Sequence, residues 1–216
     1  MDITQLKEKM WKVGVIPVIA IDSPELALPM ADALIEGGLP VAEITFRTDA
    51  AADVIGALRK ERPDILLGAG TILSVENLEK AKECGAAFGV SPGLNPAVVE
   101  RAIKLDFPFF PGVMTPSEIE QGIHYGIKVL KFFPSEATGG IKMIKAVTAP
   151  YAHLGVKLIP TGGVNMSNLE EYLSLPQTLV VGGTWVAKKD LINAKQWNEI
   201  KKNAREVLEI VHRVRG

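Results

Sequence analysis

Short apolar runs recur along the chain at a nearly even spacing, and they predict a succession of buried β-strands. Each run is rich in valine, isoleucine, leucine or phenylalanine, a composition typical of strands that are covered on both faces. The runs lie at residues 14–21, 41–47, 65–72, 87–92, 107–113, 128–134, 157–163 and 178–185.

Segments with helical periodicity separate these runs, and several of them carry residues that begin and end helices. In residues 23–38, Ser23 is a predicted N-cap with Pro24 at the first helical position, and Gly37 ends the periodic pattern. Residues 74–85 and 115–126 repeat this arrangement, with serine or threonine at the start and glycine at the end. We therefore expect a helix after most strands.

Eight strands that alternate with helices predict an α/β protein whose parallel sheet closes into a (β/α)8 TIM barrel. An open doubly wound sheet is the alternative, but eight units of similar length without a break favour closure. A helix is expected before the first strand, and a long helix over about residues 194–214 after the last. No linker rich in glycine, serine or proline divides the chain, so we expect one domain over residues 1–216.

Composition and charge indicate which binding partners and which cellular compartment are expected. The formal net charge is -1 without a long run of either sign, so no basic surface predicts binding to nucleic acid or an anionic membrane. The longest apolar stretch, residues 13–21, is too short to span a bilayer, and the first residues lack the apolar core of a signal peptide. With Cys84 as the single cysteine, these features indicate a cytoplasmic protein.

Polar residues are rare within the predicted strands, and active sites of such barrels lie at the carboxyl ends of the strands. Glu43, Thr45 and Arg47 alternate along the second strand and therefore share one face, which we place in the barrel interior. A buried glutamate–arginine pair with a structural role would explain two of them. The alternative is an acid–base carboxylate with an anion-binding arginine one layer above it.

Lys131 lies in the middle of the apolar sixth strand, where an ammonium group would lose its water shell at a considerable cost. A structural salt bridge to Glu43 across the barrel is one interpretation. The other is an amine nucleophile: burial and a nearby cation such as Arg47 both favour the neutral amine, which attacks a ketone to form a Schiff base. Phe133 shares the strand face of Lys131 and would form a wall of the pocket.

Two glycine pairs follow the seventh strand and end the eighth. In many barrels, backbone N–H groups at these two positions bind phosphate. Tight turns without a ligand are the alternative. The pairs and the threonines beside them are Thr161, Gly162, Gly163, Gly182, Gly183 and Thr184.

The remaining motifs exclude several classes of site. The GAGT sequence at residues 68–71 offers close backbone approach and the hydroxyl of Thr71, but it lacks the third glycine of a dinucleotide-binding motif. The three histidines fall away from the predicted strand ends, and no cluster of residues has metal-ligand spacing. We therefore expect chemistry that needs neither a metal nor an organic cofactor.

Together these residues resemble the 2-keto-3-deoxy-6-phosphogluconate (KDPG) aldolases, which also act on 4-hydroxy-2-oxoglutarate (KHG). The segments VAEITFRT, GAGTIL, VSPGLN, FFPGVMTPSE, VLKFFPSEATGG, IPTGGV and VGGTWV carry the resemblance in unbroken order over about residues 10–190. It implies a metal-independent class I aldolase of the Entner–Doudoroff pathway, usually a homotrimer. Such an enzyme cleaves KDPG to pyruvate and glyceraldehyde 3-phosphate, and KHG to pyruvate and glyoxylate.

The resemblance also implies roles for individual residues. By motif position, Lys131 matches the Schiff-base lysine of the family and Glu43 its general acid–base. Arg47 and Thr71 match the groups that hold the pyruvate carboxylate, and the glycine pairs match the phosphate site. Thr161 is expected near the C4 hydroxyl of the substrate.

Two positions depart from the family pattern. Members often have alanine where this chain has Ser135, and serine where it has Thr184. Position 184 therefore keeps a hydroxyl and gains a methyl group.

Two other functions share part of this pattern. A phosphate-binding barrel isomerase or epimerase would use the same glycine pairs, but it would not need a buried lysine nucleophile. A non-catalytic sugar-phosphate-binding scaffold would bind the same ligands without turnover. Release of pyruvate distinguishes the aldolase from both.

Overall fold

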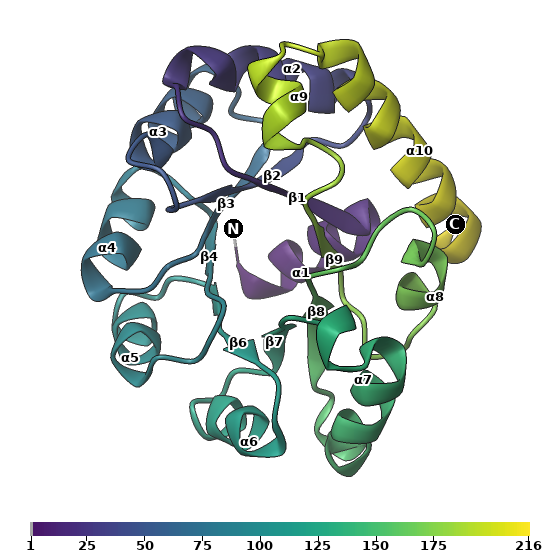
Figure 1. Cartoon of the computed structure of the whole chain (residues 1–216). Coiled ribbons are helices and arrows are strands. Elements are labelled where there is room, and N and C mark those ends of the chain that lie inside the picture. Colours follow the sequence, from purple (N-terminus) through teal and green to yellow (C-terminus); the bar gives the residue numbers. More distant parts are fainter. Residues whose placement is uncertain (1) are drawn as a thin grey trace.

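The structure is a computed structural model that describes residues 2–216. Parallel strands surround a common centre, and most helices lie outside them, whereas the first helix, residues 3–13, lies across the middle of the ring in this view (Figure 1). The strands form a six-stranded sheet in the order β5-β4-β3-β2-β1-β9 and a three-stranded sheet in the order β6-β7-β8. They are β1 (Val15–Ile19), β2 (Val41–Thr45), β3 (Leu66–Gly70), β4 (Phe88–Val90), β5 (Phe109–Phe110), β6 (Gly112–Val113), β7 (Val129–Phe132), β8 (Lys157–Pro160) and β9 (Val181–Gly183).

The predicted fifth strand, residues 107–113, is two strands that are separated at Pro111. β5 ends the larger sheet and β6 begins the smaller one. Proline has no N–H group with which to continue a ladder. Directly after it, Gly112 passes so close to the backbone carbonyl of Pro92 that a β-carbon would collide with it. The chain therefore changes sheets at this point.

The second junction between the sheets lies between β8 and β9. Only two isolated parallel bridges, Leu158–Thr178 and Thr161–Gly182, connect β8 with the chain that leads into β9 and with β9 itself. Strand pairing is therefore not continuous over the eight expected units. The structure establishes a curled, parallel α/β half-barrel, whereas the sequence predicted a fully closed barrel.

The helices follow the strands as the sequence indicated. The α-helices are α1 (Ile3–Val13), α2 (Ala27–Glu36), α3 (Ala51–Glu61), α4 (Val75–Glu83), α5 (Pro96–Lys104), α6 (Pro116–His124), α7 (Gly140–Thr148), α8 (Leu169–Leu173), α9 (Lys189–Asn193) and α10 (Trp197–Arg215). Three 3-10 helices are η1 (Pro24–Leu26), η2 (Glu136–Thr138) and η3 (Ala149–Leu154). None of the helices described in residues 2–216 is long and apolar enough to cross a membrane.

Two of the three helix starts predicted from capping residues are confirmed, those of α4 and α6. Ser74 caps α4, and Thr115 caps α6 in a reciprocal capping box with Glu118. Ser23 accepts a hydrogen bond from a backbone N–H group, but the helix that it caps is the 3-10 turn η1. Pro24 therefore begins that turn, and α2 starts three residues later, at Ala27.

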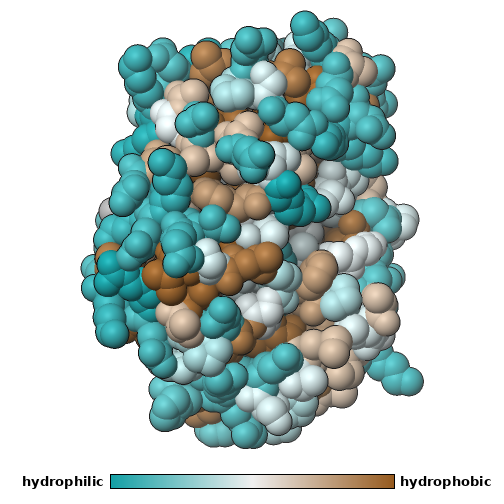
Figure 2. Space-filling view, turned by 60° about the vertical axis from the view of Figure 1, so that its left-hand side comes forward, coloured by the Kyte–Doolittle hydropathy of each residue, from teal (hydrophilic) through white to brown (hydrophobic). Residues whose placement is uncertain are grey.

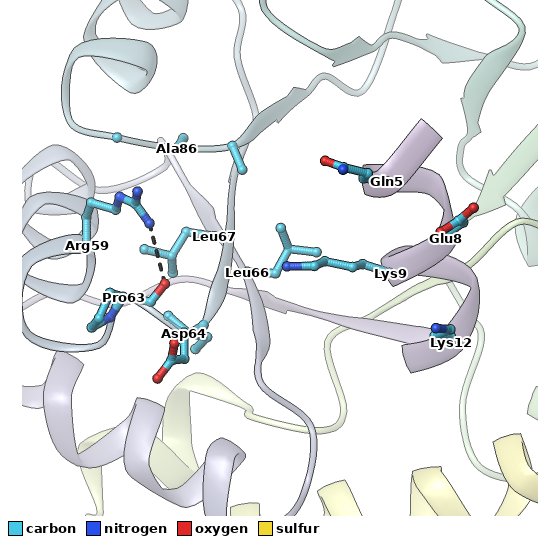
Figure 3. Close-up of a pocket in the computed structure, with 13 residues that line it drawn as sticks. Gln5, Glu8, Lys9, Lys12, Arg59, Pro63, Asp64, Leu66, Leu67 and Ala86 are labelled. Atoms are coloured by element: carbon cyan, nitrogen blue, oxygen red, sulfur yellow. Dashed lines mark hydrogen bonds between the residues drawn. The ribbon is translucent and has the colours of Figure 1, made fainter. Parts of the chain in front are cut away.

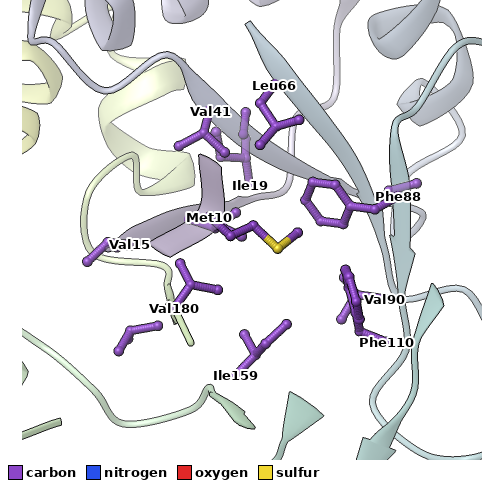
Figure 4. Packing of buried hydrophobic residues seen from close by; sticks show 14 of the residues in the cluster. Met10, Val15, Ile19, Val41, Leu66, Phe88, Val90, Phe110, Ile159 and Val180 are labelled. Carbon is purple, nitrogen blue, oxygen red and sulfur yellow. The ribbon is translucent and has the colours of Figure 1, made fainter. Parts of the chain in front are cut away.

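Helix α1 closes the end of the sheet at which the strands begin. Its Leu6 and Met10 side chains are 1% and 0% exposed. Figure 4 shows Met10 among apolar side chains of several strands, including Val15 and Phe88. Burying a side chain of this size stabilises the fold by about 1.5–3 kcal/mol. The apolar core therefore fills this end of the strands, and open space remains at the opposite end.

Candidate active site

A cavity of about 240 Å³ lies at the carboxyl ends of the strands. It is small, and most of the site residues predicted from the sequence line it. Its lining is Val18, Glu43, Arg47, Thr71, Pro92, Lys131, Phe133, Thr161, Gly162, Gly163, Val164, Gly182 and Thr184.

Lys131 and Glu43 face each other across the interior of the curled sheet. They come from β7 and β2, which do not pair with each other, yet Lys131 Nζ lies 3.6 Å from Glu43 Oε1. The two side chains are 7% and 3% exposed. Alternation along each strand explains the convergence, because Lys131 points inward while Leu130 and Phe132 on either side are fully buried among the apolar residues.

The Glu43 carboxylate is poorly satisfied for a buried group. Its Oε1 atom is buried and makes no hydrogen bond within residues 2–216. Gly70 in the neighbouring strand β3 provides the space, because a β-carbon there would collide with this oxygen. A buried carboxylate that has only a distant ion-pair partner is costly, so structural satisfaction alone does not explain the pair.

Phe133 follows the lysine strand and lies beside the amine. Lys131 Nζ is 5.6 Å from the centre of the Phe133 ring, within the range of a cation–π contact. The ring is 36% exposed and lines the cavity. It therefore covers one side of the amine with an apolar wall.

Arg47 lies in the turn after β2 and not on the strand, where the sequence placed it. Its Nε donates a hydrogen bond to Thr45 Oγ1 at 3.1 Å, and Thr45 Oγ1 donates to the carbonyl of Ile19 at 2.9 Å. Thr45 is 1% exposed. This buried hydroxyl fixes one edge of the guanidinium and leaves its terminal nitrogens available for a carboxylate. The sequence put Thr45 on the correct face, but it gave no role to the residue.

Thr71 lines the cavity directly after β3, in an unusual backbone conformation. Its φ angle is 57°, in the left-handed region that β-branched residues rarely adopt. Such a residue is strained by about 1–3 kcal/mol, and strain of this kind concentrates at functional sites. Thr71 lines the cavity in this conformation, which no sequence pattern indicated.

The loop after β8 is held by hydrogen bonds to its carbonyl oxygens. The carbonyls of Thr161 and Gly162 accept from the backbone N–H groups of residues 135–136, at 2.8 and 3.0 Å. The carbonyl of Gly163 accepts from Asn165 Nδ2 at 3.1 Å. Three consecutive carbonyl oxygens of this loop thus accept hydrogen bonds.

The N–H groups of the same loop have the opposite orientation. In a trans peptide the C=O and the following N–H point in opposite directions, and the peptides of this loop are trans. The N–H groups of Gly162 and Gly163 therefore point away from residues 135–136, and that of Val164 points away from the Asn165 side chain, in a segment that lines the cavity. None of the three donates a hydrogen bond to another group within residues 2–216. Successive unpaired N–H groups in a glycine turn form a nest that suits an anion.

The two glycines of the second pair have different surroundings. Gly182 lines the cavity, and a β-carbon there would collide with Thr161 Oγ1. Gly183 does not line the cavity, and its lack of a side chain makes room for the ring of Trp185. The next residue, Thr184, again lines the cavity. The structure thus brings Gly182 and Thr184 to the first glycine pair but leaves Gly183 outside.

A comparison with known families shows to which family the chain belongs. A family model described as "Aldolase: KDPG and KHG aldolase" matches residues 6–203. The chain belongs to the KDPG and KHG aldolase family. The match includes all the candidate residues.

Individual relatives agree with this assignment. The 2-dehydro-3-deoxy-phosphogluconate aldolase of Haemophilus influenzae is 48% identical over 96% of this chain and 97% of its own length. The KHG/KDPG aldolase of Escherichia coli K12 is 42% identical over 93% of this chain and 98% of its own length. A crystal structure of the KDPG aldolase from Legionella pneumophila, with pyruvate captured as a covalent carbinolamine intermediate, has a TM-score of 0.89. It is 38% identical and covers 93% of this chain and 97% of its own.

Three residues of the aldolase cavity were not anticipated from the sequence: Val18, Pro92 and Val164. Val18 pairs in register with Glu43, so the position of β1 beside β2 could have indicated it. Pro92 follows β4 as Thr71 follows β3, and the same strand-end rule applies to it. Val164 contributes its backbone to the nest, which depends on carbonyl orientations that the sequence does not contain.

A larger cleft of about 790 Å³ lies at the opposite end, between α1 and the start of β3 (Figure 3). Its charged side chains, including Lys9, Lys12 and Arg59, are exposed, and Arg59 donates to the carbonyl of Pro63 at 3.4 Å. It contains none of the buried polar groups of the aldolase cavity. Within residues 2–216 the structure contains no group of three or more histidine, cysteine, aspartate or glutamate side chains that could hold a metal ion.

Proposed function

We propose that this protein is a class I, metal-independent aldolase that cleaves KDPG to pyruvate and glyceraldehyde 3-phosphate. The same site is proposed to cleave KHG to pyruvate and glyoxylate. The observation that carries the proposal is the buried Lys131 amine, 3.6 Å from the Glu43 carboxylate in the wall of a cavity. Relatives named as KDPG or KHG/KDPG aldolases over nearly the whole chain support it, as does the Legionella structure with covalent pyruvate.

The reaction begins at Lys131. Its neutral amine attacks C2 of the 2-keto acid, and after proton transfer the carbinolamine loses water to give an iminium ion. This cation is the electron sink for the next step. When the C3–C4 bond breaks, its electron pair flows to the iminium nitrogen, which leaves an enamine on the lysine.

Glu43 supplies the proton transfers on either side of bond cleavage. Its carboxylate removes the proton of the C4 hydroxyl, directly or through a water, so that the aldehyde leaves as the C3–C4 bond breaks. The protonated carboxyl then returns the proton to C3 of the enamine. Hydrolysis of the resulting pyruvate iminium releases pyruvate and regenerates the amine. The open Glu43 Oε1 atom supports this role, since it has no other hydrogen-bond partner within residues 2–216.

The two ends of the substrate require different anion sites. Arg47 and Thr71 are proposed to hold the carboxylate, which fixes C2 beside the lysine. The N–H groups of residues 162–164, together with Thr184, are proposed to hold the phosphate at the far end. Thr161, whose side chain is buried at the start of this loop, is proposed to lie near the C4 hydroxyl.

We also propose a closed (β/α)8 barrel in a single domain over residues 1–216, and a homotrimer in the cytoplasm that acts in the Entner–Doudoroff pathway. The bridges between β8 and β9, and the continuous chain across Pro111, support closure. Exposed apolar side chains support association. Figure 2 shows apolar residues gathered on one face of the molecule, and the exposed apolar side chains include Leu73 and Ile103. Light scattering on the purified protein tests for the trimer.

Borohydride trapping tests the proposed chemistry. Reduction in the presence of pyruvate should add one pyruvate-derived adduct to Lys131, which peptide mass spectrometry locates. Lys131→Ala should lose the adduct and lower kcat by roughly 10³-fold or more, since it lacks the nucleophile. Lys128→Ala, which removes an exposed lysine at the start of the same segment, is the matched control. An adduct elsewhere, or an active Lys131→Ala variant, would refute the mechanism.

Pyruvate release tests the substrate assignment. A coupled assay with lactate dehydrogenase should detect pyruvate from both KDPG and KHG. A sugar-phosphate-binding scaffold would bind KDPG without releasing pyruvate. An isomerase or epimerase would convert a sugar phosphate and remain active after treatment with borohydride and pyruvate.

A further inference from the structure

A buried tyrosine hydroxyl lies behind the phosphate-binding loop, on the side away from the cavity. Tyr172 in α8 is fully buried, and its hydroxyl donates a short hydrogen bond to Glu136 Oε1. The same hydroxyl lies 2.9 Å from Ser135 Oγ. Because the phenol has one proton, which it gives to Glu136, the Ser135 hydroxyl donates to the tyrosine oxygen.

Tyr172 keeps its proton over the whole physiological range. Burial, followed by the hydrogen bond to the Glu136 carboxylate, raises the pKa of Tyr172 to about 12. Ser135 is 0% exposed, so the hydroxyl pair lies in the interior. Glu136 is an exposed residue, and its Oε1 atom is the one that accepts the hydrogen bond from the buried Tyr172 hydroxyl.

Glu136 fits tightly between Gly163 in the loop after β8 and Gly140 at the start of α7. A β-carbon on Gly163 would collide with Glu136 Cβ, and one on Gly140 would lie 2.7 Å from Glu136 Oε1. Both glycines have positive φ angles, 83° and 57°. The stem of Glu136 therefore lies directly against the loop that carries the nest, and the tyrosine hydroxyl holds the end of that side chain.

The backbone connects this contact with the nest. The N–H groups of residues 135–136 donate to the carbonyls of Thr161 and Gly162, and those bonds orient the N–H groups of Gly162 and Gly163 in the nest. Ser135 and Glu136 thus each use their backbone to hold the loop and their side chain to reach Tyr172. We propose that Tyr172 is a positioning residue that aligns the phosphate-binding N–H groups through Ser135 and Glu136.

This inference rests on the proposed function, and it predicts an effect confined to one end of the substrate. KDPG ends in a phosphate that needs the aligned N–H groups, whereas KHG has no phosphate. Arg47 and Thr71, which are proposed to bind the carboxylate, lie in other loops, and the Tyr172 hydroxyl makes no hydrogen bond to them or to Lys131 within residues 2–216. The side chain of Ser135 contributes a second hydrogen bond to the Tyr172 hydroxyl.

The test compares the two substrates in Tyr172→Phe. Loss of the hydroxyl should raise KM for KDPG by about tenfold, the usual effect of removing a buried hydrogen bond to a charged group. KM and kcat for KHG, and borohydride trapping of pyruvate, should stay within about twofold of the unmodified protein. Ser135→Ala should raise KM for KDPG in the same direction by about two- to threefold.

The matched control is Tyr151→Phe. Tyr151 is also largely buried, and its hydroxyl also donates to a glutamate, Glu120, at 2.9 Å, but it does not contact the phosphate-binding loop. This control should leave the ratio of the two KM values unchanged. Melting temperatures of all variants show whether a change is only a loss of folding.

Equal changes in KM for KDPG and KHG, or no change for KDPG, would overturn the proposal. Should Tyr172→Phe fail to fold, the same ratio measured in Ser135→Ala decides the question. A failure of the proposed function looks different, because the unmodified protein would then release no pyruvate from either substrate.

Discussion

The strands carry different side chains at their two ends. Where they begin, α1 covers them, and Leu6 and Met10 fill the space with apolar atoms. Where they end, Glu43 and Lys131 are buried with an incomplete set of partners. The first end has the composition that stability favours. The second accepts buried polar groups that destabilise the fold, which indicates that selection at this end acts on chemistry.

The largest effect on turnover that separates the two ends is expected for Glu43→Gln. Loss of the base should lower kcat by about 10²–10⁴-fold while adduct formation with pyruvate remains at least partly intact, because the lysine still attacks C2. Steady-state kinetics and borohydride trapping measure the two steps separately. Glu8→Gln, in the exposed face of α1 at the other end, is the control and should retain full activity. If Glu43→Gln changes turnover little, the acid–base assignment is wrong.

Met10→Ala tests the apolar end. A cavity in this packed core should lower the free energy of unfolding by about 2–5 kcal/mol, with kcat and KM unchanged well below the melting temperature. Urea denaturation measures the loss. Ile3→Ala on the same helix removes a side chain that is 44% exposed, and it should change stability by less than about 0.5 kcal/mol. A large loss of activity in folded Met10→Ala would contradict the separation between the ends.

Thr45→Val tests a smaller contribution at the polar end. The variant keeps the shape of the side chain but removes the acceptor for Arg47 Nε, which then loses its fixed orientation. KM should rise by about three- to tenfold for both KDPG and KHG, since both carry the carboxylate that Arg47 is proposed to bind. Thr45→Ser keeps the hydroxyl and should restore KM. A rise for KDPG alone would assign the effect to the phosphate end instead.

The smallest effect concerns a surface ion pair between Asp32 in α2 and Arg62, which follows α3. The hydrogen bond from Arg62, with burial as an opposing effect, lowers the pKa of Asp32 below its usual value of 3.8. Because the folded-state pKa is depressed, the stabilisation is present above the unfolded-state pKa and is lost as pH falls through the folded-state value. Urea midpoints should therefore fall slightly below about pH 4, and less so in Asp32→Asn. The pair is partly exposed, so a large pH dependence of this origin would be unexpected.

Sequence patterns predicted the elements well where the signal was local. Alternation placed Glu43 and Lys131 in the interior, and capping residues placed the starts of α4 and α6. Family resemblance then assigned roles to these residues. The break at Pro111 was missed, although proline is a known interruption of strands, because the apolar run continues on both sides of it.

Features that depend on distant backbone groups could not be predicted. Arg47 was expected on a strand but lies beyond its end, and its orientation depends on Thr45 and on a carbonyl of the neighbouring strand. The strained conformation of Thr71 and the contact of Tyr172 with Glu136 have no short-range signature. Gly183 resembled a phosphate-binding residue because a glycine needed for packing looks the same in a sequence as one needed for a ligand.

The covered end of the strands is also where the two terminal helices, α1 and α10, meet. Arg215, in the last turn of α10, donates to the carbonyl of Trp11 in α1 and to that of Leu179 just before β9. Both terminal helices are therefore fastened to the face opposite the cavity. A fluorescent protein or a second enzyme joined at either terminus should leave the substrate entrance open, so that this aldolase would be suitable for building fused, multi-step catalysts.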